Sequence, residues 1–465
     1  MKPKLVIVGA GLAGCCLAHE LCNDWDISFI ELVSKPSIYL QSKIIDVGWP
    51  ATTYPHIGSG LGGTTQFWHN GLIEISENVF DEEWPFPKSD LQEYYKKAYN
   101  FLSDTKYNVI VREAGVLRQR YLDFGISEDL LGESLVYPTS RLNLWKKINL
   151  DKRVTVIDGL ATGVNWSGDK ILSLIVQTNN NSINVEGDKF VFAAGGIGTP
   201  ILLQKIQLKN DLSLFLTAGR MYQDHPTGFV GEVKLNRPFY KLWNFPITGC
   251  RLNMRIPLKV EKNGLVASFQ LRPSLTRKIG DKVIRVRSIL SEIQNFPFRI
   301  KNYLRLFKHL DDFIEILSFK FGINFRTKNY SVLMVADQPG EESLGIYADD
   351  HNGRIYRNWI IDDNYVEKIN RLIEKLYSKL STNIEHAIIY KDWKNNIMSS
   401  SHHSGTARMG VDKEDSVVDE NCKVHGVENL YICDGSVIPS SGYANTGLTI
   451  AALSFRLSEH LNFLK

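Results

Sequence analysis

The sequence predicts an α/β fold with a parallel sheet at its start and a smaller α+β domain with an antiparallel sheet further along. Residues 4–9 form a continuous apolar run typical of a buried parallel strand, and a helical pattern (about 12–23) and a second strand (27–31) follow. After about residue 221, strand-like runs appear at 228–235, 249–256, 265–271 and 330–336. Residues 401–465 return to a glycine-rich strand–turn–helix pattern.

The pattern along the chain therefore predicts a discontinuous first domain. Residues 1–220 and 395–465 would form it, and residues 221–394 would form the second domain. Between the two parts of the parallel sheet, helical patterning lies near 90–102 and 141–148. Short strands are predicted at 154–157, 171–177, 182–185 and 189–193.

Composition excludes several classes of protein. The 465 residues are 43% hydrophobic, and 54 basic against 51 acidic residues leave a net charge of +3, which gives no sign of nucleic-acid binding. No apolar run reaches the roughly 18 residues of a spanning helix, and no signal-peptide pattern precedes the first strand. Six cysteines without a C-x-x-C pair indicate reduced thiols, no metal site and a cytoplasmic location.

One further segment has two interpretations. Residues 296–321 predict a helix that is apolar nearly all round, with basic residues near its start. It is either a helix packed within the second domain or an interfacial helix that docks on a membrane or a partner.

A dinucleotide motif opens the chain. Gly9, Gly11 and Gly14 form G-x-G-x-x-G directly after the first strand, with Leu12 and Ala13 starting the helix. The glycines allow a tight turn, close approach of a pyrophosphate and close helix–sheet packing, and the helix N-terminus attracts phosphate. Glu31 ends the next strand, where its carboxylate can accept a hydrogen bond from a ribose 2′-hydroxyl. These features predict a Rossmann-type domain.

The C-terminal segment carries a more specific pattern. It reads SHHSGTARMG at 401–410, SVVD at 416–419, VENLYICDGSVIP at 427–439 and GYANTGLTI at 442–450. This strongly resembles the C-terminal signature of the glucose–methanol–choline (GMC) oxidoreductases. The stretches 60–65, 192–200 and 219–225 agree with further motifs of that family in the same order. Residues 62–68 are most similar to the pyranose-oxidase and sugar-dehydrogenase branch.

The resemblance implies FAD as the cofactor, bound by the Rossmann-type domain. Some relatives of that branch tether the flavin to a histidine just before the tryptophan, but Phe67 stands there and implies noncovalent FAD. Asn445-Thr446 replaces the usual Asn-Pro, and Thr446 restores a backbone N–H that proline lacks. The cofactor-binding residues that we predict are Gly9, Gly11, Leu12, Ala13, Gly14, Glu31, Gly62, Gly63, Thr64, Thr65, Trp68, Ala161, Ala194, Gly195, Asp434, Gly435, Thr446, Gly447 and Leu448.

The resemblance also implies alcohol oxidation. Such a reaction removes a proton from oxygen and a hydride from carbon, so the protein must supply a base. Carried over by motif, His402 is that base and Asn445 holds the alcohol oxygen. Adjacent side chains in an extended run point to opposite faces, so we interpret His403 as structural, and the pair Asp224-His225 as structural support behind the site.

The substrate remains open at this stage. Sugars, amino-sugars and polyols are the first expectation, with residues 221–394 as the substrate-binding domain and His69, Gln270, Arg272 and Gln338 as candidate contacts. A sterol or aliphatic alcohol, a redox-inert FAD-binding protein, and a subunit of a membrane-attached dehydrogenase are the alternatives. The electron acceptor and the oligomeric state are not predicted.

Overall fold

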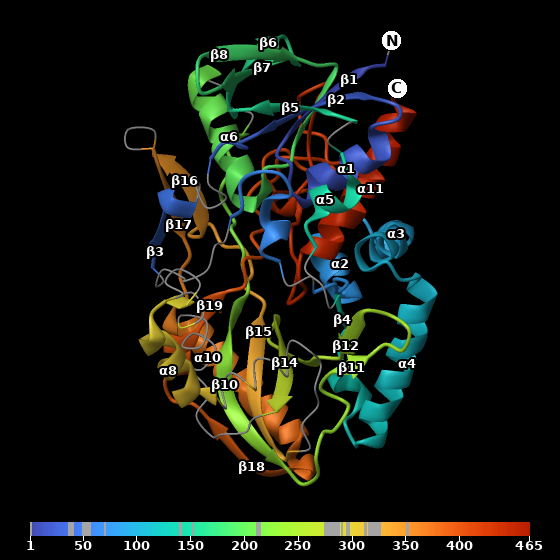
Figure 1. Cartoon of the computed structure of the whole chain (residues 1–465), viewed down its shortest axis with the longest axis vertical. Helices are drawn as coiled ribbons and strands as arrows, with labels where there is room; N and C mark the ends of the chain where they lie inside the picture. Colours follow the sequence, from blue (N-terminus) through green and yellow to red (C-terminus); the bar gives the residue numbers. More distant parts are fainter. Residues whose placement is uncertain are drawn as a thin grey trace.

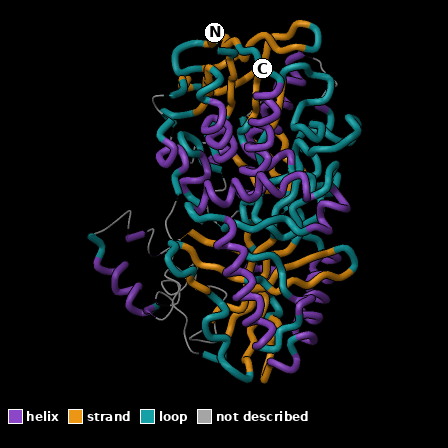
Figure 2. The backbone as a smooth tube through the Cα atoms, turned by 90° about the vertical axis from the view of Figure 1, so that its right-hand side faces the viewer, coloured by secondary structure: helices purple, strands orange, loops and turns teal. Residues whose placement is uncertain are grey.

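The computed structural model describes residues 2–35, 41–48, 57–68, 71–138, 142–150, 153–210, 215–273, 289, 292–293, 298–310, 314, 327–349 and 353–465. Figure 1 shows an elongated molecule with one large sheet in its upper half and a second large sheet in its lower half. Both termini lie close together at the upper end (Figures 1 and 2).

A five-stranded parallel sheet organises the upper half, in the order β20-β9-β1-β2-β5. Its strands are β1 (Lys4–Val8), β2 (Asp26–Glu31), β5 (Thr155–Asp158), β9 (Lys189–Phe192) and β20 (Leu430–Ile432). The first helix, α1 (Leu12–Leu21), packs on the last, α11 (Gly447–Phe463), which also contacts α3 (Gln92–Ser103). The two ends of the chain are therefore joined in one layered unit, with α1 beside α11 in Figure 1.

Further elements complete the upper half. A three-stranded antiparallel sheet consists of β6 (Leu160–Ser167), β7 (Lys170–Gln177) and β8 (Ser182–Glu186). Helix α6 (Gly195–Asn210) follows β9 and contacts β6.

The lower half contains the predicted antiparallel sheet. Its order is β13-β14-β15-β10-β18, and every pair in it is antiparallel. The strands are β10 (Pro226–Leu235), β13 (Leu258–Lys262), β14 (Leu265–Pro273), β15 (Asn329–Ala336) and β18 (Ile384–Ile389), and β19 (Met398–Ser399) pairs with β10. Helix α10 (Asp363–Lys379) covers this sheet with buried residues at i, i+3, i+4 and i+7, from Ile369 to Leu376.

Two small sheets tie the predicted domains together. In one, β4 (Leu135–Pro138) pairs with β12 (Leu252–Arg255), which pairs with β11 (Phe245–Pro246). In the other, β3 (Ile44–Val47) pairs with β17 (Arg354–Asn358), which pairs with β16 (Gly345–Asp349). Strands from residues 1–220 thus pair with strands from residues 221–394. The division into domains along the chain stays a prediction.

Several helices were not predicted from the sequence: α2 (Glu77–Glu83), α4 (Tyr107–Asp123), α6 and α10. Helix α4 buries Ile110, Leu117 and Tyr121, which recur at i, i+7 and i+11, so its helical spacing is present in the sequence and was overlooked. Helix α6 is apolar on several sides and begins with glycines, with Pro200 inside it, which hides its pattern. The predicted helix 141–148 is α5 (Leu144–Ile148), and residues 142–143 precede it.

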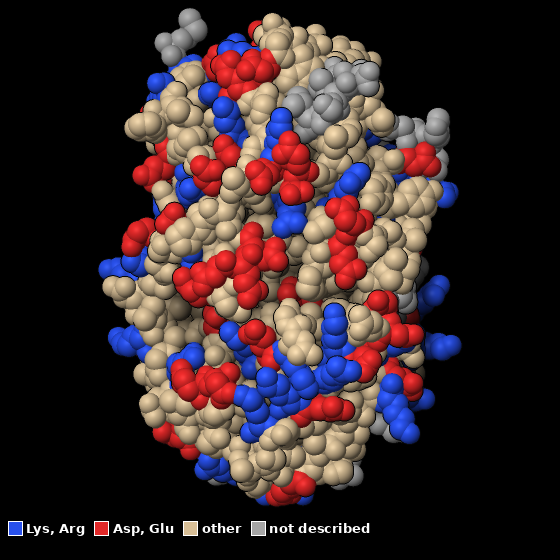
Figure 3. Space-filling view, turned by 180° about the vertical axis from the view of Figure 1, so that it is seen from behind, with Lys and Arg blue, Asp and Glu red and all other residues tan. Residues whose placement is uncertain are grey.

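The face of the molecule that Figure 3 shows carries mixed charge. Figure 3 shows Lys and Arg interspersed with Asp and Glu, with a denser basic group in the lower half. Of the predicted helix 296–321, residues 300–308 form α8 (Ile300–Lys308), and residues 296–297, 311–313 and 315–321 lie outside the described residues. None of the helices in the described part of the chain combines the length and apolar content that crossing a membrane requires.

Candidate active site

The N-terminus of α1 is shaped by three glycines with different surroundings. A Cβ at Gly9, whose φ is +104°, would lie 2.4 Å from the Ala193 carbonyl oxygen, and a Cβ at Gly14 would lie 2.2 Å from the Gly9 carbonyl oxygen. Both positions therefore require glycine for backbone packing. A Cβ at Gly11 would meet no atom within 4 Å, so Gly11 borders open space.

This open space lies at an uncapped helix end. Helix α1 has Gly11 as its N-cap, with no side-chain cap and no acidic residue in its first turn. The backbone N–H groups of Leu12 and Ala13 lie in that first turn, where backbone N–H groups have no acceptor within the helix. The arrangement fits a phosphate group.

Glu31 binds the backbone of Ala10, which directly precedes this helix end. Its carboxylate accepts hydrogen bonds from the backbone N–H groups of Ala10 (2.8 Å), Leu32 (2.9 Å) and Gly60 (3.0 Å). Burial raises the pKa of Glu31, and the three donors offset that effect only in part. Because a carboxylate has about four acceptor positions, one more donor such as a sugar hydroxyl can be accommodated.

A backbone hydrogen bond holds the segment that carries Ala161 next to Glu31. The N–H of Gly159 donates to the carbonyl of Glu31 at 3.1 Å, and Ala161 follows two residues later, buried in β6.

Residues 60–68 connect the surroundings of Glu31 with α11, the last helix. Gly62 N–H donates to the Ala10 carbonyl at 2.9 Å, and a Cβ at Gly63 would lie 2.8 Å from Gly11 Cα. At the far end, the Trp68 ring covers Gly447, where a Cβ would lie 2.2 Å from it. The segment contains the 3₁₀ helix η2 (Gly63–Gln66).

Two threonines of that 3₁₀ helix differ in exposure. Thr65 is buried, and its hydroxyl donates to the Gly62 carbonyl, whereas Thr64 is exposed. The next predicted contact, His69, lies outside the described residues.

Helices α6 and α11 have contrasting N-termini. At α6, the Asp434 carboxylate accepts from Gly195 N–H (2.8 Å), Thr199 Oγ1 (2.6 Å) and Ser436 N–H (2.8 Å), so this carboxylate caps the helix. Burial raises the pKa of Asp434, against the effect of those donors. Ala194 N–H donates to Thr199 Oγ1 at 3.1 Å. The side chain of Asp434 is thus engaged within the protein.

The neighbouring glycines have different surroundings. A Cβ at Gly195 would meet no atom within 4 Å, whereas a Cβ at Gly435 would lie 2.5 Å from the His403 carbonyl oxygen. Helix α11, by contrast with α6, has Thr446 as N-cap without a side-chain hydrogen bond, and no acidic residue in its first turn. The N–H groups of Gly447 and Leu448 stand at this uncapped end, under the Trp68 ring.

His402 meets a second histidine. Its Nδ1 lies 3.0 Å from Nδ1 of His225, and the two rings form an edge contact with centroids 5.0 Å apart. His225 Nε2 lies 3.0 Å from Ser441 Oγ. Burial lowers the pKa of His402 to about 4 and that of His225 to about 3, so both imidazoles are neutral at pH 7.

Backbone hydrogen bonds hold these two histidines opposite each other. Ser400 N–H donates to the His225 carbonyl (3.1 Å), and Ser404 N–H donates to the Gln223 carbonyl (3.0 Å). Ser401, between them, has a left-handed φ of +60°, which is uncommon for a residue other than glycine. The segment before His402 is therefore bent and docked on the 223–225 segment.

The Asp224 carboxylate binds the backbone of both histidines. It accepts from the backbone N–H groups of His225 (2.7 Å) and His402 (3.0 Å) and from the Ser399 hydroxyl. Burial raises its pKa, but His403 and Ser399 outweigh this and hold the pKa below its ordinary value. His403 is buried, with Nδ1 2.7 Å from Tyr222 Oη and 3.6 Å from Asp224. His403 thus lies in the interior, beside Tyr222 and Asp224.

Asn445 reaches the interface with the lower half. A Cβ at Gly71 would lie 2.9 Å from Asn445 Nδ2 and 3.2 Å from the Tyr137 ring. Asn445 follows Ser441 by four residues, so the loop that contacts His225 also carries Asn445. The Tyr137 ring, on β4, lies under the Arg255 guanidinium at 4.7 Å from its centroid.

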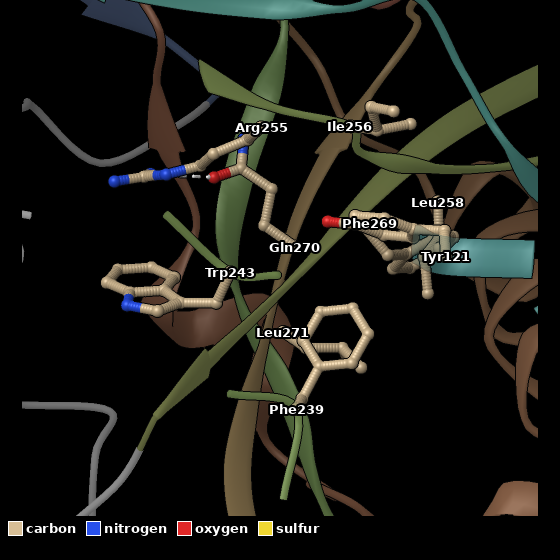
Figure 4. Close-up of a pocket in the computed structure, with 9 residues that line it drawn as sticks. All are labelled: Tyr121, Phe239, Trp243, Arg255, Ile256, Leu258, Phe269, Gln270 and Leu271. Atoms are coloured by element: carbon tan, nitrogen blue, oxygen red, sulfur yellow. Dashed lines mark hydrogen bonds between the residues drawn. The ribbon is translucent and has the colours of Figure 1, made fainter. Parts of the chain in front are cut away.

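Beyond Tyr137 lies a small pocket among the lower strands (Figure 4). Arg255 is buried there between the Tyr137 and Trp243 rings, and its Nη1 donates to Gln270 Oε1 at 3.3 Å. The other lining residues are Tyr121, Phe239, Ile256, Leu258, Phe269 and Leu271. Of the predicted substrate contacts, the structure thus places Gln270 in this pocket.

Two other predicted contacts have partners elsewhere. The Gln338 amide donates to the Ile360 carbonyl at 3.0 Å and accepts from the Trp359 indole, so both of its ends are engaged inside the protein. The Arg272 guanidinium lies over the Phe229 ring at 5.7 Å.

Sequence reasoning missed two features here. The sequence predicts Asp224-His225 as structural support behind the site, but it does not indicate the direct contact between His225 and His402, which spans 177 residues. Arg255 was not singled out, and the alternating strand in which it lies carries no signal for it.

Comparison with known proteins identifies the C-terminal part of the chain. Residues 364–454 match the model of the GMC oxidoreductase family. The fructose dehydrogenase large subunit of Gluconobacter japonicus is 42% identical over 67 residues, which are 14% of this chain and 12% of that protein. Matching curated relatives align over segments that span between 8% and 25% of their own length.

Solved structures resemble the whole chain. Pyridoxine 4-oxidase from Mesorbium loti superimposes with a TM-score of 0.62 at 16% identity, covering 99% of both chains. An FAD-dependent oxidoreductase from Chaetomium thermophilum gives 0.60 at 13% identity, covering 100% of this chain and 99% of that one. These likenesses establish a shared fold. They confirm the predicted α/β class, and the family match confirms the predicted GMC resemblance.

Proposed function

We propose that this chain, whose residues 364–454 form a GMC oxidoreductase domain, binds FAD and oxidises an alcohol. The observation that carries the proposal is the His402 imidazole, which is neutral, is held through one nitrogen and sits on the loop that follows β19. In the described part of the chain, no protein group bonds its other nitrogen, Nε2. A neutral imidazole with a free nitrogen is what a general base requires.

Two helix ends support FAD as the cofactor. The uncapped N-terminus of α1 fits the pyrophosphate, with Gly11 leaving the space and Glu31 available to a ribose hydroxyl. The uncapped N-terminus of α11 fits the electron-rich end of the flavin, where N–H donors stabilise negative charge. When bound, FAD supplies the hydride acceptor. Phe67 cannot form a covalent link, so we propose noncovalent binding.

His225 controls which nitrogen of His402 carries the proton. One proton lies between the two Nδ1 atoms, since both rings are neutral. If His225 carries its proton on Nε2 and donates it to Ser441, its Nδ1 must accept from His402. His402 Nε2 then keeps a lone pair and takes the proton from the alcohol. We assign Asn445 to holding the alcohol oxygen beside it.

A sugar or polyol is the substrate class that we propose first. Arg255 and Gln270 supply polar groups beyond Tyr137, and Trp243 and Tyr137 supply flat apolar faces, a combination suited to a hydroxylated ring. Fructose dehydrogenase, among the relatives, is named for such a substrate. The alternative is a non-sugar alcohol, which the name of pyridoxine 4-oxidase favours and the aromatic lining would also accept.

The test is an anaerobic absorbance spectrum of the purified protein with sugars, polyols, pyridoxine and aliphatic alcohols added in turn. Absorbance of oxidised flavin that one class bleaches supports the cofactor, the reaction and the substrate class together. Admitting air then separates an oxidase from a dehydrogenase. A protein that carries no flavin and takes up none would refute the proposal. Flavin that no alcohol bleaches would instead favour the redox-inert alternative.

A further inference from the structure

Helix α8 presents its apolar side to solvent. Ile300, Tyr303, Leu304 and Phe307 recur at i, i+3, i+4 and i+7, the spacing of one helix face. Ile300 is 74% exposed, Leu304 58% and Phe307 73%. In a helix that packs on a core, the apolar face is the buried one. In α8 the apolar face is instead the exposed one.

The more buried side of the helix carries two polar residues and one leucine. Asn302 is buried, and Leu306 and His309, at i+4 and i+7 from it, are half-buried. At 100° per residue this side lies roughly opposite the exposed apolar face. Figure 2 shows the helix at the edge of the lower half, standing away from the two large sheets. The more exposed side of the helix is thus its apolar face, and the more buried side lies opposite it.

Basic residues flank the apolar face. Lys301, Arg305 and Lys308 form a second stripe along one side of the helix, and Arg305 also pairs with Glu292 at 2.7 Å. Residues 298–310 contain four Lys or Arg residues and no Asp or Glu. Phe298, just before the helix, is 96% exposed.

We propose that residues 298–310 dock the protein on an anionic lipid surface. Large apolar side chains next to a lysine stripe match the boundary between acyl chains and negatively charged headgroups. A folded protein partner or a second copy would need an apolar surface but gives no reason for the flanking positive charge. The helix lies in the interface and does not cross the bilayer, since α8 has nine residues.

The test is flotation of the purified, full-length protein with vesicles. One set contains phosphatidylcholine with phosphatidylglycerol, and the other contains phosphatidylcholine alone. The wild type should float with the anionic vesicles at low salt, less at high salt, and weakly with the neutral vesicles. The double variant I300E/F307E should reduce the floating fraction by about tenfold, because it places charge on the inserting face. The variant K301E/K308E should remove the preference for anionic vesicles.

A matched control carries a similar change elsewhere. Phe463, 87% exposed at the end of α11, becomes Glu in F463E, which should float like the wild type. Three outcomes would overturn the proposal: no flotation of the wild type with either vesicle, equal loss in F463E and I300E/F307E, or a dimer in solution that I300E/F307E converts to monomer. The last would make α8 a contact between copies. None of these readouts depends on flavin or alcohol, so failure here leaves the proposed activity untouched.

Discussion

Around the N-terminus of α1, backbone segments touch because glycines leave no side chain between them, whereas around His402 the segments are joined by side-chain hydrogen bonds. Gly9 and Gly14 have backbone oxygens where a Cβ would stand. His402, His225 and Ser441 form a row of polar contacts at 3.0 Å. The first region requires residues without a side chain so that the backbone segments can touch. The second requires that each side chain donates or accepts a proton in the right direction. Changes in the first should therefore alter stability and cofactor binding, and changes in the second should alter rate.

The largest expected effect is at His402. In His402→Ala the alcohol proton has no acceptor, so the rate of flavin reduction should fall by about 10²–10⁴-fold, with FAD content unchanged. The measurement is anaerobic stopped-flow bleaching with an alcohol that the wild type oxidises. His386→Ala, which removes an exposed histidine on β18, is the control and should keep the wild-type rate. An active His402→Ala variant would remove this residue from the chemistry.

A pair of glycine variants separates packing from binding. Gly14→Ala puts a methyl group 2.2 Å from the Gly9 carbonyl oxygen and should lower the free energy of unfolding by about 1–3 kcal/mol. Gly11→Ala meets no protein atom, so unfolding of the cofactor-free protein should change by less than about 0.5 kcal/mol. FAD affinity should nevertheless fall in Gly11→Ala, because the methyl group enters the proposed phosphate space. Urea unfolding and FAD titration measure both. Equal FAD affinity in Gly11→Ala and wild type would argue against a pyrophosphate there.

His225 should affect the rate less than His402 does. His225→Phe removes the acceptor for the His402 Nδ1 proton, and flavin reduction should slow by about tenfold, the equivalent of one hydrogen bond. His225→Asn places an amide oxygen close to the lost nitrogen and should recover part of the rate. A purely structural His225 would show the same rate loss in both variants, in proportion to their loss of stability.

The smallest effect concerns pH. Unfolded histidines bind a proton below about pH 6.5, whereas burial keeps folded His225 neutral down to about pH 3 and His402 to about 4. The unfolded state therefore binds more protons in this window, and stability falls as pH falls below 6.5. We expect the free energy of unfolding to be about 1–2 kcal/mol lower at pH 5.5 than at pH 7, with the smaller share from half-buried His402. In His225→Asn this difference should shrink, and urea titrations at both pH values measure it.

The same contrast explains what could be predicted from the sequence. Gly9, Gly11, Gly14 and Glu31 lie within one β-α-β unit, so their roles follow from local spacing. The antiparallel character of the second sheet also followed from alternation along its strands. These features need no knowledge of distant contacts.

Features that depend on distant contacts were not predictable. The Asp434 carboxylate caps α6 across 239 residues, a contact that the sequence does not indicate, and its predicted contact with the cofactor stays a prediction. Gln338 looked available beside a strand, but Trp359 and Ile360 occupy its amide. Whether a polar side chain is free depends on neighbours that the chain brings from elsewhere, and periodicity does not contain that information.

The segment 60–68 has a consequence for how the site tolerates change. It bonds Glu31 at one end and covers Gly447 at the other, and between them it touches the α1 turn. Its length therefore sets the separation between the adenosine and flavin positions of the proposed site. One residue more or fewer would shift one end by up to about 3.5 Å relative to the other. Substitutions there can be absorbed locally, but insertions and deletions cannot, so the segment acts as a spacer whose residue count is under stronger constraint than its composition.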